Sequence, residues 1–309
     1  MNKIKLLVIV GPTASGKSNL SLEVAERFDA EIVSVDSMLV YKGMDIGTAK
    51  PTAAELLSVP HHMIDIVEPD AEFSAADYMK RATIAIEDIT ARGKRALVAG
   101  GTGLYLRALL EGIFEGPSRS NELRREFAEA IERDGLAALH VELAAVDPEA
   151  AARIHPNDAT RIVRALEVYR ITGRSISSLQ KEQALTESPY ETLKIGLTKE
   201  RAELYTGIDR RVDAMMDAGL LEEVRGLLRK GYSSQLRPMQ ALGYKEMVSH
   251  IEGVVGLSEA IEALKKNTRN FAKRQFTWFG KDKRIRWFAP GEKTAIMAAA
   301  AEFWPSKTG

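Results

Sequence analysis

The sequence predicts an α/β fold in which a parallel β-sheet is flanked by helices and interrupted by a helical insertion. Short apolar, β-branched runs such as Lys5–Val10 alternate with helical patterns over the first part of the chain, which is the order of a parallel sheet. Strand patterns then disappear and return at Thr192–Leu197. We therefore divide the chain into an α/β core, residues 1–112 and 191–309, and a helical insertion, residues 113–190.

Composition is typical of a globular protein. The 309 residues are 45% hydrophobic and 28% charged, and 43 Lys and Arg balance 43 Asp and Glu. Any affinity for nucleic acid must therefore come from local clusters of charge. The absence of cysteine excludes disulfides, thiolate metal sites and cysteine nucleophiles. Because no membrane span or signal peptide is recognisable, we expect a cytoplasmic protein with no membrane partner.

A phosphate-binding loop follows the first predicted strand. The residues from Gly11 to Ser18 fit G-x-x-x-x-G-K-[ST], and a helical pattern follows at Asn19–Phe28. The glycines let successive backbone N–H groups face an anion at the helix N-terminus, and Lys17 adds a positive charge. The hydroxyl of Ser18 suits Mg²⁺, the cofactor that we expect. The predicted phosphate ligands are Gly11, Pro12, Thr13, Ala14, Ser15, Gly16, Lys17 and Ser18.

This motif predicts a P-loop NTPase-like fold and, by itself, suggests nucleotide binding, specifically ATP binding. The alternative is a Gly/Ser turn between a strand and a helix that binds nothing. The agreement of all fixed positions with both flanking elements favours the phosphate site.

The second predicted strand, Glu31–Asp36, places Asp36 at its carboxyl end. Ligands of open parallel sheets bind at that edge, so we expect Asp36 to share a crevice with the phosphate loop. A carboxylate in this position can act as a general base. The alternative is that Asp36 only caps the following turn.

A long loop is expected over Met38–Pro60, which is rich in Gly, Thr and Pro. A long ordered loop beside a phosphate site is typical of a substrate loop. His61 and His62 follow, and because adjacent residues of an extended chain point to opposite sides, we interpret them as structural or solvated residues and not as metal ligands. The residues Met63–Val67 then have a strand pattern.

A second glycine cluster, residues 100–103, lies between a predicted strand at Ala96–Ala99 and a predicted helix at Leu104–Leu110. Its backbone can approach a ligand in the same crevice. The strand lacks the terminal acidic residue with which many phosphate-hydrolysing P-loop proteins hold Mg²⁺, so Asp36 is the nearest candidate acid.

The insertion has three helical patterns, Glu122–Arg133, Leu136–Val146 and Asp158–Ile171. Its arginines either contact a nucleic acid or form an ordinary solvated helix surface. The candidates for contact are Arg124, Arg161 and Arg164.

The remainder of the chain is expected to be helical, with helices at Arg201–Asp217, Ser258–Phe279 and Ala295–Phe303. The first of these carries Arg210 and Arg211, either of which can reach a diphosphate. The second places Lys266, Arg269 and Lys273 on one face, which is either a track for a phosphate backbone or a solvated face.

The order of several motifs resembles one family. The motifs are Gly11–Ser18, Asp36-Ser37 with Tyr41, Gly43–Pro51, Gly100–Tyr105, Arg161–Tyr169, Leu242–Glu246 and Lys273–Phe279. In these residues the chain is similar to the tRNA dimethylallyltransferases, also called tRNA isopentenyltransferases, of the IPP transferase family. Two positions depart from the commonest family pattern. Leu39 stands where Gln is frequent, and Gly207 stands where an Arg often precedes the second Arg, here Arg211.

The resemblance implies transfer of a dimethylallyl group from dimethylallyl diphosphate to N6 of adenine 37, next to the anticodon in tRNA, with release of pyrophosphate. It implies a catalytic set of Asp36, Lys17, Thr13 and Arg211, with Mg²⁺ on Ser18. It implies tRNA contacts at Asp36, Ser37, Met38, Leu39, Thr102, Arg124, Arg161, Arg164, Lys273 and Arg274, with the insertion engaging the anticodon arm. We expect a monomer.

Two other classes share part of this pattern. A P-loop kinase of a small molecule would use the same first strand, loop and helix, with Asp36 activating a hydroxyl, but it would not need a basic aromatic C-terminal helix. A nucleotide-switched RNA-binding protein would use the basic helix, but it would have little use for Asp36 in the crevice.

Overall fold

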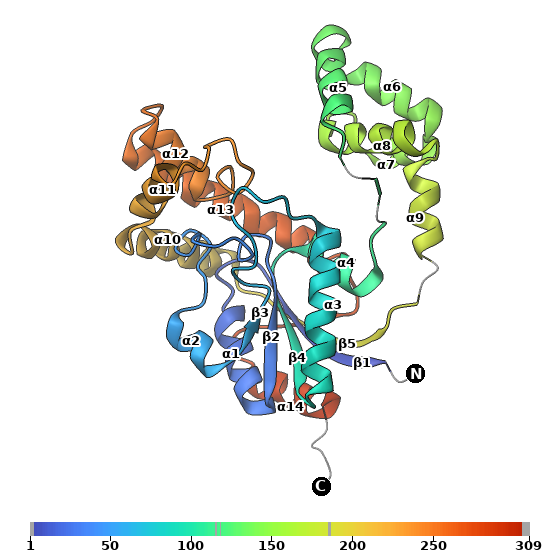
Figure 1. The fold of residues 1–309 in the computed structure, drawn as a ribbon. Helices are drawn as coiled ribbons and strands as arrows, with labels where there is room; N and C mark the ends of the chain where they lie inside the picture. The colour runs from blue at the N-terminus through green and yellow to red at the C-terminus, as the bar shows by residue number, and fades with distance from the viewer. Residues whose placement is uncertain (1–2, 115, 118, 185–186, 305–309) are drawn as a thin grey trace. The chain divides into compact units, whose positions relative to one another are not determined.

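The computed structural model describes residues 3–114, 116–117, 119–184 and 187–304. The chain divides into two compact units, one made of Met1–Leu110 with Pro189–Gly309 and the other of Glu111–Ser188. The first unit contains the sheet, and the described elements of the second are all helices (Figure 1).

Six strands form one parallel sheet in the order β3-β2-β4-β1-β5-β6. The strands are β1 (Ile4–Val10), β2 (Ala30–Val35), β3 (His61–His62), β4 (Arg95–Gly100), β5 (Tyr190–Leu197) and β6 (Ile285–Phe288). After the helical unit the chain returns to the sheet in β5, which pairs with β1 along its length. The predicted P-loop NTPase-like parallel sheet is therefore confirmed.

Nine helices accompany the sheet in the described part of this unit. They are α1 (Lys17–Phe28), α2 (Ala53–Ser58), α3 (Ala75–Ala91), α4 (Gly103–Glu111), α10 (Arg201–Asp217), α11 (Leu220–Arg229), α12 (Tyr244–Ile251), α13 (Leu257–Phe279) and α14 (Lys293–Phe303).

From Leu6 to Val10, β1 is buried on both sides, because helices cover both faces of the sheet. Alternate residues Leu7 and Ile9 pack with α1 and α14 in one cluster that includes Trp304. On the opposite face the hydroxyl of Tyr78, in α3, donates a hydrogen bond of 2.9 Å to the carbonyl of Ser34 in β2. Full burial of each large apolar side chain contributes roughly 1.5–3 kcal/mol, so this core fixes the sheet firmly.

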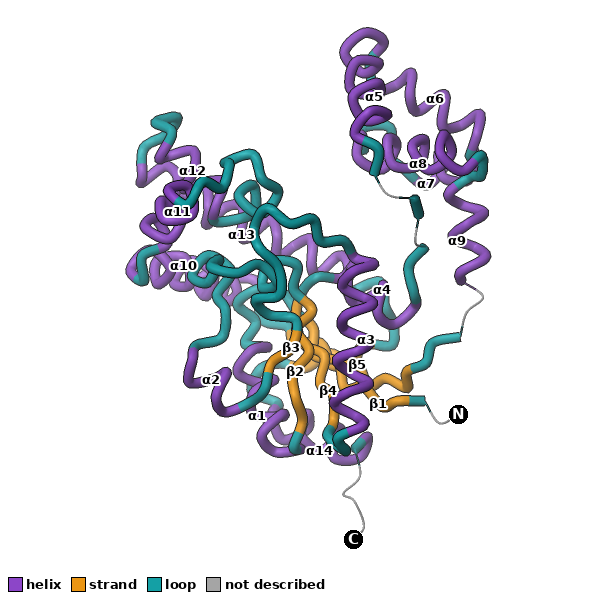
Figure 2. Tube along the Cα trace, viewed as in Figure 1, coloured by secondary structure: helices purple, strands orange, loops and turns teal. Residues whose placement is uncertain are grey.

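The parallel arrangement brings the carboxyl ends of β1, β2 and β4 to one edge of the sheet. The loops that leave these strands gather there, as Figure 2 shows in teal. A ligand site is expected at this edge.

The predicted strand at Met63–Val67 is wrong, because the edge strand is the two-residue β3, which pairs with β2. Met63 and Asp65 have φ angles of 66° and 54°, in the left-handed region, so an extended strand cannot continue through them. His62 is structural, as interpreted from sequence, since its Nε2 lies 2.7 Å from Glu31 Oε2.

The expected loop Met38–Pro60 contains one short helix, α2, that was not predicted. Thr52 and Glu55 form a capping box at its start, but α2 buries no residue and so shows no apolar periodicity.

The prediction of a wholly helical remainder is also wrong, because β6 adds a sixth strand beside β5. Its alternation places Ile285 in the interior and leaves Arg286 exposed. The two-residue alternation of this strand was not recognised in the sequence, because basic residues surround its apolar positions.

The helical unit contains α5 (Asn121–Asp134), α6 (Leu136–Val146), α7 (Pro148–Arg153), α8 (Ala159–Thr172) and α9 (Ile176–Ala184). The three predicted helices correspond to α5, α6 and α8, whereas α7 and α9 were not predicted. Asp147 joins these two short helices, because its carboxylate accepts hydrogen bonds from the backbone N–H groups of Ala150 and Ser177. The apolar core of this unit is formed mainly by Phe127, Leu139, Leu143, Ile162 and Leu166.

Candidate active site

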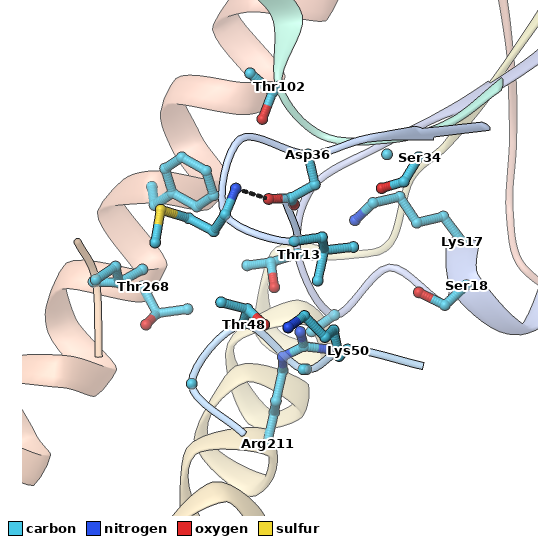
Figure 3. A pocket seen from close by; sticks show the side chains of 18 of the residues that line it. Thr13, Lys17, Ser18, Ser34, Asp36, Thr48, Lys50, Thr102, Arg211 and Thr268 are labelled. Atoms are coloured by element: carbon cyan, nitrogen blue, oxygen red, sulfur yellow. Dashed lines mark hydrogen bonds between the residues drawn. The ribbon is translucent and has the colours of Figure 1, made fainter. Parts of the chain in front are cut away.

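A pocket of about 850 Å³ lies at the carboxyl edge of the sheet, within the α/β unit. Its wall combines the P-loop, the end of β2, the loop of residues 47–51, and side chains from α10 and α13. Figure 3 shows Lys17, Asp36 and Arg211 directed toward this space from three different elements.

The P-loop turns from β1 into α1 as predicted. Gly16 is the N-cap of α1 with a φ of 94°, a left-handed conformation that glycine adopts at little cost. Of the eight predicted phosphate ligands, those that line the pocket are Thr13, Ala14, Gly16, Lys17 and Ser18. The other three, Gly11, Pro12 and Ser15, are buried and do not line the pocket.

The charges of the pocket influence one another. The pKa of Lys17 is lowered from 10.5 to about 8, mainly by burial and next by the nearby charge of Arg211, whereas Asp36 opposes the change. Burial also lowers the pKa of Arg211, again opposed by Asp36. Lys17, Arg211 and Asp36 thus share a pocket that is also lined by the cations Lys50, Lys199, Lys245 and Arg274 and by the carboxylate of Glu55, and this excess of positive charge suits an anionic ligand. From the sequence, either Arg210 or Arg211 could reach a diphosphate. Of the two, Arg211 lines the pocket and Arg210 does not.

Asp36 is held in place by the turn after β2. Its Oδ1 accepts a hydrogen bond of 2.8 Å from the backbone N–H of Met38, drawn in Figure 3. Asp36 therefore caps the turn. It is not restricted to that role, because it also lines the pocket, where its carboxylate can take up a proton.

Two predicted tRNA contacts, Ser37 and Thr102, come together beside Asp36. The backbone N–H of Ser37 donates to Oγ1 of Thr102 at 3.0 Å, and the N–H of Thr102 donates to the carbonyl of Val35 at 3.0 Å. These bonds join the second glycine cluster to the end of β2. Ser37, Met38, Leu39 and Thr102 all line the pocket.

Gln275 of α13 links the two glycine loops. Its Oε1 accepts a hydrogen bond of 2.8 Å from the backbone N–H of Thr13, and its Nε2 donates one of 3.1 Å to the carbonyl of Gly101. The side chain is buried. This role of Gln275 could not be predicted from local sequence, because the two backbone partners are 262 and 174 positions away.

We expect Gln275→Leu to destabilise the α/β unit by about 2 kcal/mol, because it leaves the part-buried N–H of Thr13 and the buried C=O of Gly101 without partners. All three tryptophans, Trp278, Trp287 and Trp304, belong to this unit, so their fluorescence during urea unfolding reports on it alone. Thr277→Ala is the matched control, since that exposed hydroxyl donates only within its own helix. Equal unfolding midpoints for both variants would refute the role of Gln275.

The three arginines of the insertion that were predicted to contact tRNA form ion pairs with carboxylates of the helical unit. Glu167 is fully buried, and its carboxylate pairs with Arg124 at 3.1 Å and with Arg164 at 2.6 Å. Burial by itself raises the pKa of Glu167, but hydrogen bonds from these arginines and from Ser120 outweigh it and hold the pKa below its usual value. Arg124 and Arg164 thus stabilise this unit, whereas Arg161 is mostly exposed and forms an ion pair with the nearby Asp158.

The predicted basic face of α13 contains residues of two kinds. Lys266, Lys273 and Arg274 are exposed, and Arg274 also lines the pocket. Arg269 is half-buried and makes a two-pronged ion pair with Asp209 of α10, with contacts of 2.6 Å. Arg269 therefore holds α13 to α10 and is not a free charge on the surface.

The hydroxyl oxygen of Ser18 is a suitable ligand for Mg²⁺, and its side chain lines the pocket beside Lys17. In the described part of the chain its hydroxyl makes no hydrogen bond with another residue, so it is available to a cation. The described residues contain no cluster of three or more His, Asp or Glu arranged to hold a metal. A magnesium ion here would thus depend on ligand oxygens as well as on Ser18, which fits its preference for few protein ligands.

Within the described residues, no helix combines the length and the apolar character needed to cross a membrane.

Several known proteins are similar to this chain. The family model described as IPP transferase matches residues 39–282. The tRNA dimethylallyltransferase 2 of Geotalea uraniireducens is 54% identical over 96% of both chains, and the tRNA dimethylallyltransferase of Geobacter metallireducens is 50% identical over 98% of both.

Solved structures agree with these relatives. The tRNA isopentenylpyrophosphate transferase of Bacillus halodurans has a TM-score of 0.73 and 42% identity over 97% of both chains. A eukaryotic dimethylallyltransferase acting on tRNA has a TM-score of 0.82 and 31% identity, over 96% of this chain and 78% of its own.

Proposed function

Because the chain belongs to the IPP transferase family, we propose that it transfers a dimethylallyl group from dimethylallyl diphosphate to N6 of adenine 37 in tRNA and releases pyrophosphate. The observation that carries the proposal is the presence of Asp36, Lys17 and Arg211 in one pocket. That pocket pairs an anion-binding loop with a carboxylate able to accept a proton, and the reaction needs both.

The reaction has two chemical demands. The carbon–oxygen bond of the donor breaks, and negative charge grows on the departing pyrophosphate. The adenine amine is a weak nucleophile, because its lone pair is delocalised into the ring, and it must lose a proton as the new carbon–nitrogen bond forms.

Lys17, Arg211 and the P-loop backbone N–H groups at residues 16–18 meet the first demand. Their positive charge and N–H dipoles stabilise the pyrophosphate most strongly as its charge develops, which lowers the barrier to bond breaking. Mg²⁺ on Ser18, when bound, would neutralise part of the same charge.

Asp36 meets the second demand. Its Oδ1 is oriented by the N–H of Met38, so the carboxylate is positioned to receive the proton of the attacking amine. The adenine must leave its stack in the anticodon loop to reach this pocket, and Ser37, Leu39 and Thr102 line the pocket beside the carboxylate.

We assign binding of the tRNA anticodon arm to the helical unit and the exposed basic residues of α13, and we propose that the protein acts as a cytoplasmic monomer. Arg161, Lys273 and Arg274 are the exposed candidates. Arg124 and Arg164 keep a hydrogen-bonded role with Glu167 and can contact a phosphate only with their remaining donors.

The proposal is tested by incubating the protein with Mg²⁺, unmodified tRNA and either labelled dimethylallyl diphosphate or labelled ATP. We expect prenyl label in the RNA, stoichiometric release of pyrophosphate and no nucleotide hydrolysis. A diphosphate presents the same oxygens to the loop as the end of a nucleotide does, so the P-loop motif alone does not require ATP. Obligatory ATP cleavage, or transfer of phosphate to a small acceptor, would overturn the proposal in favour of a kinase.

The exposed face of α13 gives a separate prediction. We expect Lys266→Gln and Lys273→Gln each to reduce the slope of log tRNA affinity against log salt by about 0.7–0.9, since each removes one phosphate contact. Arg269→Gln is expected to lower the unfolding midpoint as well, because it breaks the ion pair with Asp209. Binding isotherms at several salt concentrations measure the slopes. Unchanged slopes in both lysine variants would identify this face as merely solvated.

A further inference from the structure

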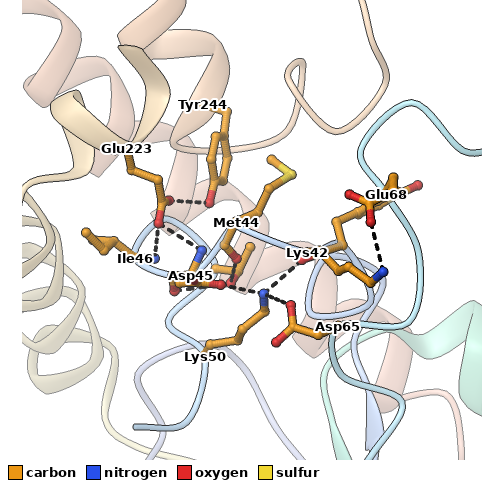
Figure 4. A network of polar contacts seen from close by, with 11 residues as sticks. Lys42, Met44, Asp45, Ile46, Lys50, Asp65, Glu68, Glu223 and Tyr244 are labelled. Atoms are coloured by element: carbon orange, nitrogen blue, oxygen red, sulfur yellow. Dashed lines mark hydrogen bonds and ion pairs between the residues drawn. The ribbon is translucent and has the colours of Figure 1, made fainter. Parts of the chain in front are cut away.

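Outside the pocket, one carboxylate gathers an unusual set of donors. Oε2 of Glu223, in α11, accepts hydrogen bonds from the backbone N–H groups of Asp45 at 2.9 Å and Ile46 at 2.7 Å. Its Oε1 accepts from the N–H of Gly47 at 3.1 Å and from the hydroxyl of Tyr244 at 2.6 Å. Figure 4 shows Glu223 reaching the loop from one side with Tyr244 beside it.

Three of these bonds hold the loop strongly, and the fourth, from Tyr244, orients the carboxylate. Hydrogen bonds to a charged acceptor are about twice as strong as neutral ones, and three consecutive N–H groups form a concave site for an anion. The four bonds also use the lone-pair sites of both carboxylate oxygens, so Glu223 has no capacity left for a substrate.

The loop fits this anchor closely. A Cβ on Gly47 would lie 2.5 Å from the ring of Tyr244, so no larger residue fits without moving the ring or the loop. At the other end of the loop, Nζ of Lys50 donates to the carbonyl of Tyr41 at 2.8 Å and to the carboxylates of Asp45 and Asp65 at 2.5 Å. Both ends of the segment are thereby fixed.

The anchored segment leads directly into the pocket. Gly47, Thr48, Ala49, Lys50 and Pro51 all line it, whereas Glu223 does not. Figure 3 shows Thr48 and Lys50 on the same side of the pocket as Arg211. A shift of the loop at Gly47 therefore moves the pocket wall beside a cation predicted to hold the diphosphate.

We propose that Glu223 is a positioning residue that fixes the loop of residues 45–51 as the wall of the diphosphate pocket, an inference that rests on the proposed function. It acts through the loop and touches no reacting atom. Its effect falls on the affinity for dimethylallyl diphosphate and pyrophosphate, and the proton transfer at Asp36 and the binding of tRNA are left nearly unchanged.

The test compares Glu223→Gln with Glu222→Gln. The neighbouring Glu222 is exposed and pairs with Arg225, so its variant makes the same charge change outside the network. Glu223→Gln places an NH₂ group against N–H donors. We expect its KM for dimethylallyl diphosphate and its Kd for pyrophosphate to rise about tenfold or more, with kcat within about threefold of wild type. Hydrogen exchange at residues 45–47 should accelerate, and Glu222→Gln should behave as wild type.

A conservative variant covers the case in which Glu223→Gln does not fold. Tyr244→Phe removes one donor and leaves the carboxylate, so it should produce a smaller rise in the same KM and Kd. If exchange at residues 45–47 accelerates while the KM and Kd stay unchanged, or if neither moves, the inference is overturned. Pyrophosphate binding is measured without turnover, so a wild-type protein that binds pyrophosphate but transfers no prenyl group would refute the proposed function and leave the role of Glu223 to be decided by that binding.

Discussion

Replacing Asp36 with asparagine is expected to reduce prenyl transfer by on the order of 10²–10⁴-fold while tRNA affinity stays at the wild-type level. Asparagine keeps an oxygen that can accept the hydrogen bond from the N–H of Met38, so the turn after β2 is preserved. It removes the capacity to take up a proton. One carboxylate contributes little to a largely electrostatic interface, so binding should persist.

Transfer and tRNA binding should be measured on the same preparation. Asp88→Asn is the matched control, because this exposed side chain of α3 pairs with Arg92 and does not line the pocket. A turnover by Asp36→Asn within about tenfold of wild type would show that Asp36 is not the general base.

The fold was predictable where a local pattern determines it. The predicted strand Lys5–Val10 has an apolar pattern because both faces of β1 are covered from Leu6 to Val10, and α3 begins at a capping box that is visible in the sequence at Ser74 and Asp77. The errors occurred where tertiary contacts, and not the local sequence, determine the secondary structure. The two-residue strand β3 exists only because it pairs with β2, and it has no apolar pattern of its own.

The site was predictable to a similar extent. The P-loop and the carboxyl end of β2 have positions fixed by the parallel sheet, so Lys17 and Asp36 could be placed in one crevice from sequence. Glu223 and Gln275 could not, because they act on backbone groups 176 and 262 positions away. Their side chains gave no local signal, since a glutamate on an amphipathic helix is ordinarily a solvated residue.

Replacing Lys17 with methionine is expected to lower turnover by on the order of 10²–10³-fold, the usual cost of removing one group that stabilises transition-state charge. The loss should appear in kcat as well as in donor affinity, because the charge on pyrophosphate is greatest as the bond breaks. Lys293→Met is the control, since Lys293 is an exposed lysine paired with Glu23. Turnover near wild type in Lys17→Met would mean that the P-loop is not used in the reaction.

The depressed pKa of Lys17 adds a proton linkage to the same site. With a pKa of about 8, Lys17 is half neutral at pH 8 in the free protein. Bound pyrophosphate favours the charged form, so binding should take up about half a proton at pH 8, almost none at pH 6.5, and nearly one at pH 9.5. Pyrophosphate affinity should therefore fall as pH rises above 8.

Calorimetry in buffers of different ionisation enthalpy measures the proton uptake. The variant Lys17→Arg stays charged, so it should lack this contribution while retaining the proton changes of pyrophosphate itself. Equal uptake in the two proteins would exclude Lys17 as the group that titrates on binding.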